Sequence, residues 1–203
     1  MHTLSPAYDN KIARKYSVRT IEHKIENKLA LQESLGWPKE KRMPMLCIPT
    51  GVSDALGGPL LRALVPGILT QGISLLVLGK GTQEYGTMFT DLAKEKSYKI
   101  AILKNEDESI RSMYAAADMA LFLVDPAPLP ELECALRYGT VPIAPATKAL
   151  QNYNPVQESG NAFLFTEKTE WHAFAAIVRA LETYNFPFDW RTIQRNCMQE
   201  AQE

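Results

Sequence analysis

A glycine-bearing segment is the first part of this sequence with residue types suited to chemistry. Gly79-Lys80-Gly81-Thr82 follows an apolar run and precedes residues with helical spacing. Glycines between a strand and a helix let backbone N–H groups approach a phosphate at the helix N-terminus. The same glycines also suit a tight turn that only needs positive φ. The segment is neither a Walker A motif nor a complete dinucleotide-binding fingerprint, so from the residues alone we favour the turn.

Three carboxylates, Asp125, Glu131 and Glu133, flank a segment in which every second residue is proline. One of them could bind a ligand, but we favour the interpretation that they are helix N-terminal charges that interact favourably with the dipole. Thr147, which follows a later apolar run, suits either phosphate binding or helix capping, and we favour capping. We therefore assign no catalytic residue from the pattern, and Asp125 and Glu131 remain the candidate carboxylates.

The strand that precedes the proline segment is expected to organise the chain. Residues 119–124 form an unbroken apolar run, typical of a parallel strand that is covered on both faces. The prolines should end this strand at Asp125. Pro130 suits the first position of the next helix, and Gly139 suits its end. A loop that leaves the carboxyl end of such a strand is where open α/β sheets bind ligands.

The rest of the chain repeats this alternation of apolar runs and amphipathic segments. Six runs are expected as strands, at residues 44–49, 73–78, 99–103, 119–124, 141–144 and 162–165. They predict an α/β fold, a Rossmann-like three-layer αβα domain with a roughly six-stranded parallel sheet. We expect residues 1–203 to form one domain, with 1–43 as a helical lead-in and 44–203 as the sheet with its helices. Right-handed crossovers should place the loops after the strands along one edge.

Three local predictions accompany this fold. Asn105 with Glu108 resembles a capping box at the start of a helix. Trp171 and Tyr138 are expected in the core. The last helix is expected from about Trp190.

Composition excludes several classes of function. The 203 residues carry a net charge of −1, which gives no electrostatic case for binding nucleic acid or an anionic membrane. No run approaches the roughly 20 apolar residues of a membrane span, and the first residues lack the pattern of a signal peptide. The three cysteines, Cys47, Cys134 and Cys197, are far apart and suit buried free thiols in a reducing, cytoplasmic compartment. The histidines show no metal-ligand spacing, so we expect no metal site.

Several segments resemble the second half of bacterial glycogen synthases and plant starch synthases. The resemblance covers nearly the whole chain in order and is most specific at 137–143, Arg-Tyr-Gly-Thr-Val-Pro-Ile. The other matching segments are 26–32, 35–36, 78–81, 84–85, 114–119, 135–136, 162–165 and 190–198. The resemblance implies the nucleotide-sugar-binding half of a GT-B retaining glycosyltransferase. That family uses ADP-glucose to extend an α-1,4-glucan.

The loops depart from the family pattern. Where the family has an Arg and a Lys that hold the diphosphate, this chain has Gly51 and Leu56. Losing such a charge-stabilising group costs roughly 3 kcal/mol of transition-state stabilisation. Whether Asp125 replaces the family's loop Glu is ambiguous. Restoring both cations, by Gly51→Arg with Leu56→Lys, should recover nucleotide affinity if the pocket persists.

The family's Thr-Gly-Gly-Leu phosphate turn reads Thr147-Lys148-Ala149-Leu150 here. Side chains at 148 and 149 would hinder backbone approach to a phosphate, although Lys80 or Lys148 could compensate in part. The resemblance thus implies as nucleotide-binding candidates Gly79, Lys80, Gly81, Thr82, Thr147 and Lys148.

In the family the acceptor glucan binds an N-terminal domain, which this sequence does not contain. An isolated second half cannot form the water-excluded site that glycosyl transfer needs. We expect a glycogen-synthase-like domain that binds ADP or ADP-glucose weakly and is inactive alone, with no cofactor beyond that substrate. Two alternatives stay open: a pseudoenzyme that binds a glucan or a protein, and one half of an enzyme whose N-terminal acceptor domain is a separate subunit.

Overall fold

The computed structural model describes residues 5–201 and contains one six-stranded parallel sheet. Its strands are β1 (Met45–Ile48), β2 (Ser74–Gly79), β3 (Ile100–Lys104), β4 (Met119–Leu121), β5 (Val141–Pro145) and β6 (Phe163–Phe165). They lie in the order β3-β2-β1-β4-β5-β6, and every neighbouring pair is parallel. The predicted fold class and all six strands are therefore confirmed.

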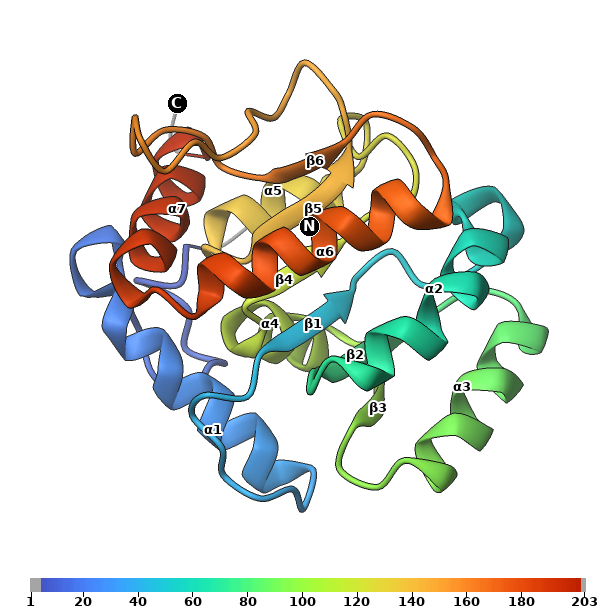
Figure 1. The fold of residues 1–203 in the computed structure, drawn as a ribbon. Coiled ribbons are helices and arrows are strands. Elements are labelled where there is room, and N and C mark those ends of the chain that lie inside the picture. The colour runs from blue at the N-terminus through green and yellow to red at the C-terminus, as the bar shows by residue number, and fades with distance from the viewer. Residues whose placement is uncertain (1–4, 202–203) are drawn as a thin grey trace.

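Helices cover both faces of this sheet (Figure 1). Helices α2 (Gly58–Thr70) and α6 (Glu170–Tyr184) pack together on one face, and α4 (Asp107–Ala116) and α5 (Pro130–Arg137) lie on the other. Helix α3 (Gln83–Glu95) packs beside β3, and α7 (Pro187–Glu200) contacts α5. Before β1, the 3₁₀ segment η1 (Val18–His23) and the α-helix α1 (Lys24–Ser34) form a helical lead-in, and a second 3₁₀ segment, η2 (Asp54–Leu56), follows β1.

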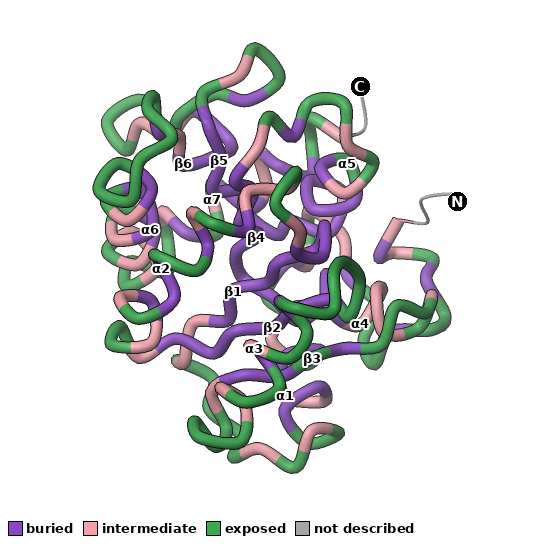
Figure 2. The backbone as a smooth tube through the Cα atoms, turned by 90° about the vertical axis from the view of Figure 1, so that its right-hand side faces the viewer, coloured by how far each residue is buried: buried purple, intermediate pink, exposed green. Residues whose placement is uncertain are grey.

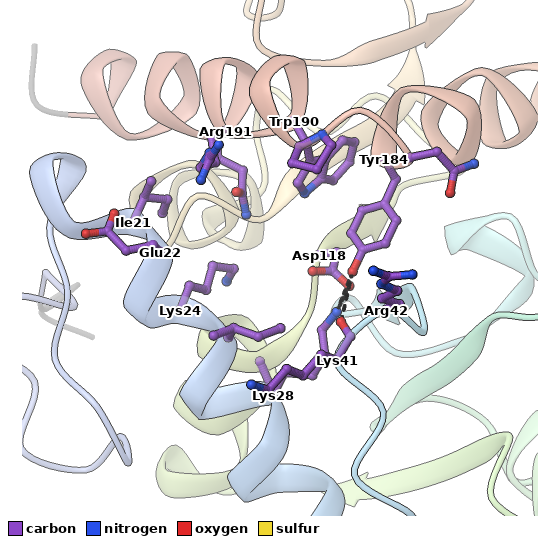
Figure 3. Close-up of a pocket in the computed structure, with 15 residues that line it drawn as sticks. Ile21, Glu22, Lys24, Lys28, Lys41, Arg42, Asp118, Tyr184, Trp190 and Arg191 are labelled. Carbon is purple, nitrogen blue, oxygen red and sulfur yellow. Dashed lines mark hydrogen bonds and ion pairs between the residues drawn. The ribbon is translucent and has the colours of Figure 1, made fainter.

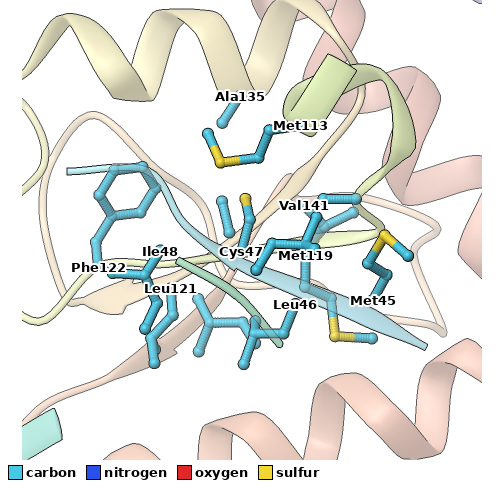
Figure 4. Packing of buried hydrophobic residues seen from close by; sticks show 14 of the residues in the cluster. Met45, Leu46, Cys47, Ile48, Met113, Met119, Leu121, Phe122, Ala135 and Val141 are labelled. Carbon is cyan, nitrogen blue, oxygen red and sulfur yellow. The ribbon is translucent and has the colours of Figure 1, made fainter. Parts of the chain in front are cut away.

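The core forms around the central strands because these have no solvent-facing side. All four residues of β1 are buried, as are the three of β4 and the five of β5 (Figure 2). In Figure 4, Met113 of α4 and Ala135 of α5 lie on the same side of the sheet as Cys47. Cys47, Cys134 and Cys197 are buried free thiols, as predicted.

Helix α5 begins and ends at the predicted residues. Pro130 occupies its first turn, where no N–H partner is needed. Gly139 follows its end with φ +61°. The Gly139 N–H donates to the Leu136 carbonyl at 2.9 Å, and the Thr140 N–H donates to the Ala135 carbonyl at 2.9 Å. These two bonds form a Schellman motif, which needs a residue with positive φ at this position.

Other local predictions were wrong. Strand β4 ends at Leu121 and not at Asp125, because the chain bends after Phe122 and brings Leu123 against Gly57. Helix α4 begins at Asp107 after Glu106, without the expected capping box at Asn105. Trp171 is 80 % exposed rather than in the core, since it lies on the solvent side of the first turn of α6. Tyr138 is buried, as predicted.

Two buried lysines attach α1 to the amino edge of the sheet. The Lys24 Nζ donates to the carbonyls of Tyr114 and Ala115 at 2.6 and 3.1 Å, at the carboxyl end of α4. These carbonyls form the negative end of the helix dipole, which offsets part of the cost of burying an ammonium group. The Lys28 Nζ lies 2.5 Å from the Asp118 carboxylate, immediately before β4. These contacts fix the position of α1 relative to the central strands.

Lys24 makes the stability of the fold depend on pH. Burial lowers the pKa of Lys24 from 10.5 to about 7, against a smaller opposing effect of Asp118. Between these two values the unfolded chain binds more protons at this lysine than the folded chain. The free energy of unfolding should therefore gain a contribution that rises with pH across this window.

Urea unfolding of the wild type and of Lys24→Met, over a pH series from about 7 to 10.5, measures this contribution. The difference in unfolding free energy between the two proteins should grow as the pH rises, because only the wild type has the group. A difference that stays constant would show that Lys24 titrates in the folded protein as it does in the unfolded chain.

Candidate functional site

The carboxyl edge of the sheet contains a topological switch point between β1 and β4. From β1 the chain proceeds outward to β2 and β3, and then returns to β4 on the other side of β1. Open α/β sheets bind ligands in the crevice at such a point. The loops after β1, β2 and β4 meet there, and those after β2 and β4 contain Lys80, Gly81, Thr82 and Asp125.

Two of the predicted residues come together at this point. Lys80 follows β2 and Glu131 lies in the first turn of α5, and their side chains form an ion pair with Nζ and Oε1 3.3 Å apart. The Lys80 side chain is 49 % exposed. An ion pair this exposed is weak, so the lysine can exchange its carboxylate for a phosphate at little cost.

Gly51 and Gly81 allow the loop after β1 and the loop after β2 to pack closely against each other. The Val52 N–H donates to the Lys80 carbonyl at 2.9 Å, and the Thr82 N–H donates to the Val52 carbonyl at 3.0 Å. Gly51 and Gly81 both have positive φ, and a Cβ on either would lie 2.0 Å from a carbonyl oxygen of the opposite loop. This close approach of the two loops leaves no room for a side chain at position 51 or 81, which explains why both residues are glycine. It also occupies backbone N–H groups of Val52 and Thr82 that a phosphate would otherwise use.

The same geometry corrects one expectation from the sequence. Reintroducing an arginine at position 51 would place its Cβ 2.0 Å from the Lys80 carbonyl oxygen, in a backbone conformation that disfavours any side chain. Gly51→Arg with Leu56→Lys therefore cannot restore a cation unless the two loops separate. Gly51 is therefore required by the packing of the loops after β1 and β2 in this chain, so an arginine there would change more than the charge of the site.

The remaining candidates lie along the edge without joining the pair. Asp125 is exposed, and its Oδ1 accepts a hydrogen bond from the Ala127 N–H at 3.0 Å, which fixes the start of the proline loop. Gly79 ends β2 beside the Leu103 carbonyl. Thr147 is half-buried and Lys148 is exposed in the loop after β5. No helix starts at Thr147, so the expected capping role was wrong.

A hollow of about 350 Å³ opens beside the Gly-Lys-Gly loop, on the β2–β3 side of it. Its lining is mainly apolar and includes Leu78, Phe89 and Ile102, together with the loop backbone. Tyr85 also lines it, and its hydroxyl donates to the Asp54 Oδ1 at 2.6 Å, which raises the pKa of Tyr85. The site can thus offer one ammonium group and one carboxylate at the switch point, next to an apolar recess.

A larger cavity, of about 590 Å³, lies at the opposite, amino edge of the sheet and was not predicted. It is bounded by α1 and by the junction of α6 and α7 (Figure 3). The only sequence signal is that Lys24 and Lys28 are one helical turn apart on the buried side of α1. Within residues 5–201, no cluster of His, Cys, Asp and Glu could hold a metal ion, and no helix has the length and apolar character needed to cross a membrane.

Comparison with known proteins gives relatives in sequence over almost the whole chain. It is 34 % identical over 196 residues to a glycogen synthase of Clostridium perfringens, which covers 93 % of this chain and 40 % of the relative. It is 34 % identical over 201 residues to a glycogen synthase of Fervidobacterium nodosum, which covers 96 % and 41 %. The matched region is the C-terminal portion of these proteins, so the chain spans about two fifths of their length. No protein-family model matches the chain.

Solved structures share the fold. The catalytic domain of starch synthase IV from Arabidopsis thaliana, determined bound to ADP and acarbose, matches with a TM-score of 0.82 at 24 % identity. That match covers 96 % of this chain and 42 % of the other. Anabaena HepE, in complex with UDP and glucose, matches with a TM-score of 0.60 at 15 % identity over 87 % of this chain and 47 % of that one. These matches confirm the GT-B type of fold that the resemblance implied.

Proposed function

Because this chain is a homologue of the C-terminal portion of glycogen synthases, with the fold of GT-B glycosyltransferases, we propose that it is a nucleotide-sugar-binding domain for α-1,4-glucan synthesis. Its ligand is ADP-glucose or a related nucleotide sugar, or ADP itself, held weakly at the carboxyl edge. Residues 1–203 act as a single domain of the GT-B C-terminal type, and the protein works in the cytoplasm.

The Lys80–Glu131 pair at the switch point is the observation that carries this proposal. It places one cation where the loops after β2 and β4 converge around β1, and the apolar recess lies beside the same loop. A diphosphate would draw Lys80 away from Glu131, while Thr82, Thr147 and Lys148 lie along the same edge. A single exposed ammonium gives weak affinity, because the attraction is screened by water and salt.

The isolated chain is proposed to be inactive. The loop after β1 has Gly51 and Leu56 at the two positions where the resemblance implies an Arg and a Lys that hold the diphosphate. The candidate catalytic carboxylates are Asp125 and Glu131. Removing a group that stabilises developing charge typically costs about 3 kcal/mol of activation free energy. Transfer would also need an acceptor site on a second domain or subunit, to exclude water around the sugar.

Lys80→Ala and Glu131→Gln should change ADP-glucose affinity in opposite directions. Removing the ammonium deletes the main attraction and should weaken binding about tenfold, as expected for a charge-assisted hydrogen bond. Neutralising Glu131 frees Lys80 and removes a repulsive charge, so binding should become severalfold tighter. Isothermal titration calorimetry measures both, and Lys94→Ala on α3 is the control because its exposed side chain pairs with Asp91 in the same helix.

Ligand-induced stabilisation gives a second readout, since ligand at 100 times its dissociation constant adds about 2.7 kcal/mol to the unfolding free energy. Equal affinities for wild type, Lys80→Ala and Glu131→Gln would contradict the assignment of the site. For a millimolar dissociation constant, ligand at about ten times that value, on the order of 10 mM, adds about 1.4 kcal/mol, and no thermal shift at that concentration of ADP-glucose would contradict nucleotide binding altogether.

The alternative is a catalytically dead pseudo-glycosyltransferase that serves as an interaction module for a glucan or a protein. The closed contact between the loops at Val52 and Gly81 favours it, as does the exposure of Trp171, Phe186 and Phe188. Binding of maltoheptaose that is lost in Trp171→Ala, without any binding of ADP-glucose, would establish the alternative. The opposite pattern would exclude it in favour of the nucleotide site.

A further inference from the structure

The loop after β1 is closed onto the loop after β2 by three hydrogen bonds. Two of them join backbones, because the Val52 N–H donates to the Lys80 carbonyl and the Thr82 N–H donates to the Val52 carbonyl. The third joins side chains, since the Tyr85 hydroxyl donates to the Asp54 Oδ1 at 2.6 Å. Together these three bonds are called the loop latch. They lie at the carboxyl edge, beside the switch point between β1 and β4.

The closed latch occupies donors that a phosphate could use. The N–H groups of Val52 and Thr82 are each directed at a carbonyl oxygen of the opposite loop. They can turn to a phosphate only when the two loops move apart. The Lys80 side chain is engaged as well, because its ammonium pairs with Glu131 at 3.3 Å. A diphosphate that meets the closed loops therefore gains the attraction of one exposed ammonium group and little more.

The loop after β1 has the features of a segment that can move. Gly51 and Gly57 bound it with φ of +73° and +84°, and residues 53–56 between them are exposed or half-buried. Glycine adopts a wide range of backbone conformations, as a hinge requires. A segment that buries little apolar surface also opens at a low cost in free energy. The hydrogen bonds of the latch are thus important in holding residues 53–56 in place.

Tyr85 is a fixed anchor for this loop on α3. Its side chain is 2 % exposed. Gly58 leaves room for the ring, since a Cβ at this position would lie 2.3 Å from the ring carbon Cζ. The Arg62 guanidinium lies over the ring, 4.9 Å from its centroid. Asp54, in contrast, is exposed, so the loop can lose the Tyr85 hydrogen bond to water while α3 stays in place.

We propose that the loop latch is autoinhibitory: closed, it withholds the N–H groups of Val52 and Thr82, and open, it offers them to a diphosphate beside Lys80. Tyr85 and Asp54 are positioning residues, which set the place of the loop and do not contact the ligand. This role rests on the proposed function, because it requires a nucleotide at the carboxyl edge. The nucleotide opens the latch by binding the open form more tightly. Its apparent dissociation constant is the intrinsic constant divided by the open fraction, so opening the latch should tighten binding.

Tyr85→Phe tests the latch because it removes only the hydroxyl group that donates to Asp54. Losing a hydrogen bond to a charged group should raise the open fraction about tenfold. Amide hydrogen exchange at Val52 and Thr82, measured without ligand, should become about tenfold faster, and calorimetry should show about tenfold tighter ADP binding. Tyr153→Phe is the matched control and should change neither quantity, because this buried hydroxyl also donates to an aspartate, Asp189 of α7, at 3.1 Å.

Gly51→Ala opens the same latch by a different route, since its Cβ would lie 2.0 Å from the Lys80 carbonyl oxygen. It should also bind ADP more tightly, whereas Gly36→Ala, with a similar φ and no clash, should bind like the wild type. Unchanged exchange at residues 52 and 82 in Tyr85→Phe would overturn the positioning role of Tyr85. If the wild type binds ADP and neither Tyr85→Phe nor Gly51→Ala binds it more tightly, the latch is overturned and the nucleotide site stands. If none of the three proteins binds ADP, the proposed function fails, and the latch fails with it.

Discussion

Lys28→Met is expected to lower the free energy of unfolding by about 3–5 kcal/mol, the cost of leaving one partner of a buried ion pair uncompensated. Lys28 is 1 % exposed, and its ammonium lies 2.5 Å from Asp118, 2.8 Å from the Tyr184 hydroxyl and 3.1 Å from the Met43 carbonyl. The Asp118 carboxylate also accepts the Met45 N–H at 2.8 Å. Methionine keeps the volume of the side chain but leaves this carboxylate charged and buried.

Urea unfolding near neutral pH measures this loss. The double variant Lys28→Met with Asp118→Asn is the matched control, because asparagine can still accept the Met45 N–H but carries no charge. It should recover a substantial part of the stability. A loss below about 1 kcal/mol for Lys28→Met, the size typical of an exposed pair, would mean that water reaches Asp118 and that α1 is not fixed by this contact.

Gly51→Ala should cost about 3 kcal/mol, the second largest effect expected. The left-handed conformation alone costs about 1–2 kcal/mol for a residue with a side chain. The new Cβ would in addition lie 2.0 Å from the Lys80 carbonyl oxygen, which forces the loops after β1 and β2 apart. That movement would also break the two hydrogen bonds of Val52 to Lys80 and Thr82.

Gly36→Ala separates these two costs. Gly36 has φ +69°, close to the +73° of Gly51, but nothing lies within 4 Å of its Cβ position. It should lose only the conformational part, about 1–2 kcal/mol, in the same urea assay. Equal losses at 36 and 51 would show that the loops separate freely, and an arginine at 51 would then be a realistic route to a stronger nucleotide site.

Much of the fold was predictable because its signals are local. Apolar runs located all six strands, and Pro130 and Gly139 marked both ends of α5. The errors arose where tertiary contacts, and not the local sequence, determine which side chain is buried and where a strand ends. Trp171 fits the apolar spacing of α6 but faces solvent, and residues 122–124 fit a strand but bend to pack against the loop after β1.

The sequence predicted the edge of the sheet where the site lies, but not the contacts between its loops. Right-handed crossovers placed Lys80 and Glu131 at the same edge, and the structure pairs them although 51 residues separate them in sequence. The contact of Gly51 with Lys80 depends on how two loops pack, which no residue pattern encodes. The amino-edge cavity was missed because a periodicity argument counts Lys24 and Lys28 as solvent-facing polar residues, whereas both are buried.

A binding map of ADP on the ¹⁵N-labelled protein tests the central claim most directly, that a weak nucleotide site persists at the carboxyl edge of a glycogen-synthase-like domain. We expect saturable shifts with millimolar affinity, confined to the backbone amides of residues 50–54, 79–82, 125–131 and 147–150. Shifts absent from these loops, or micromolar affinity despite the missing cations, would contradict it.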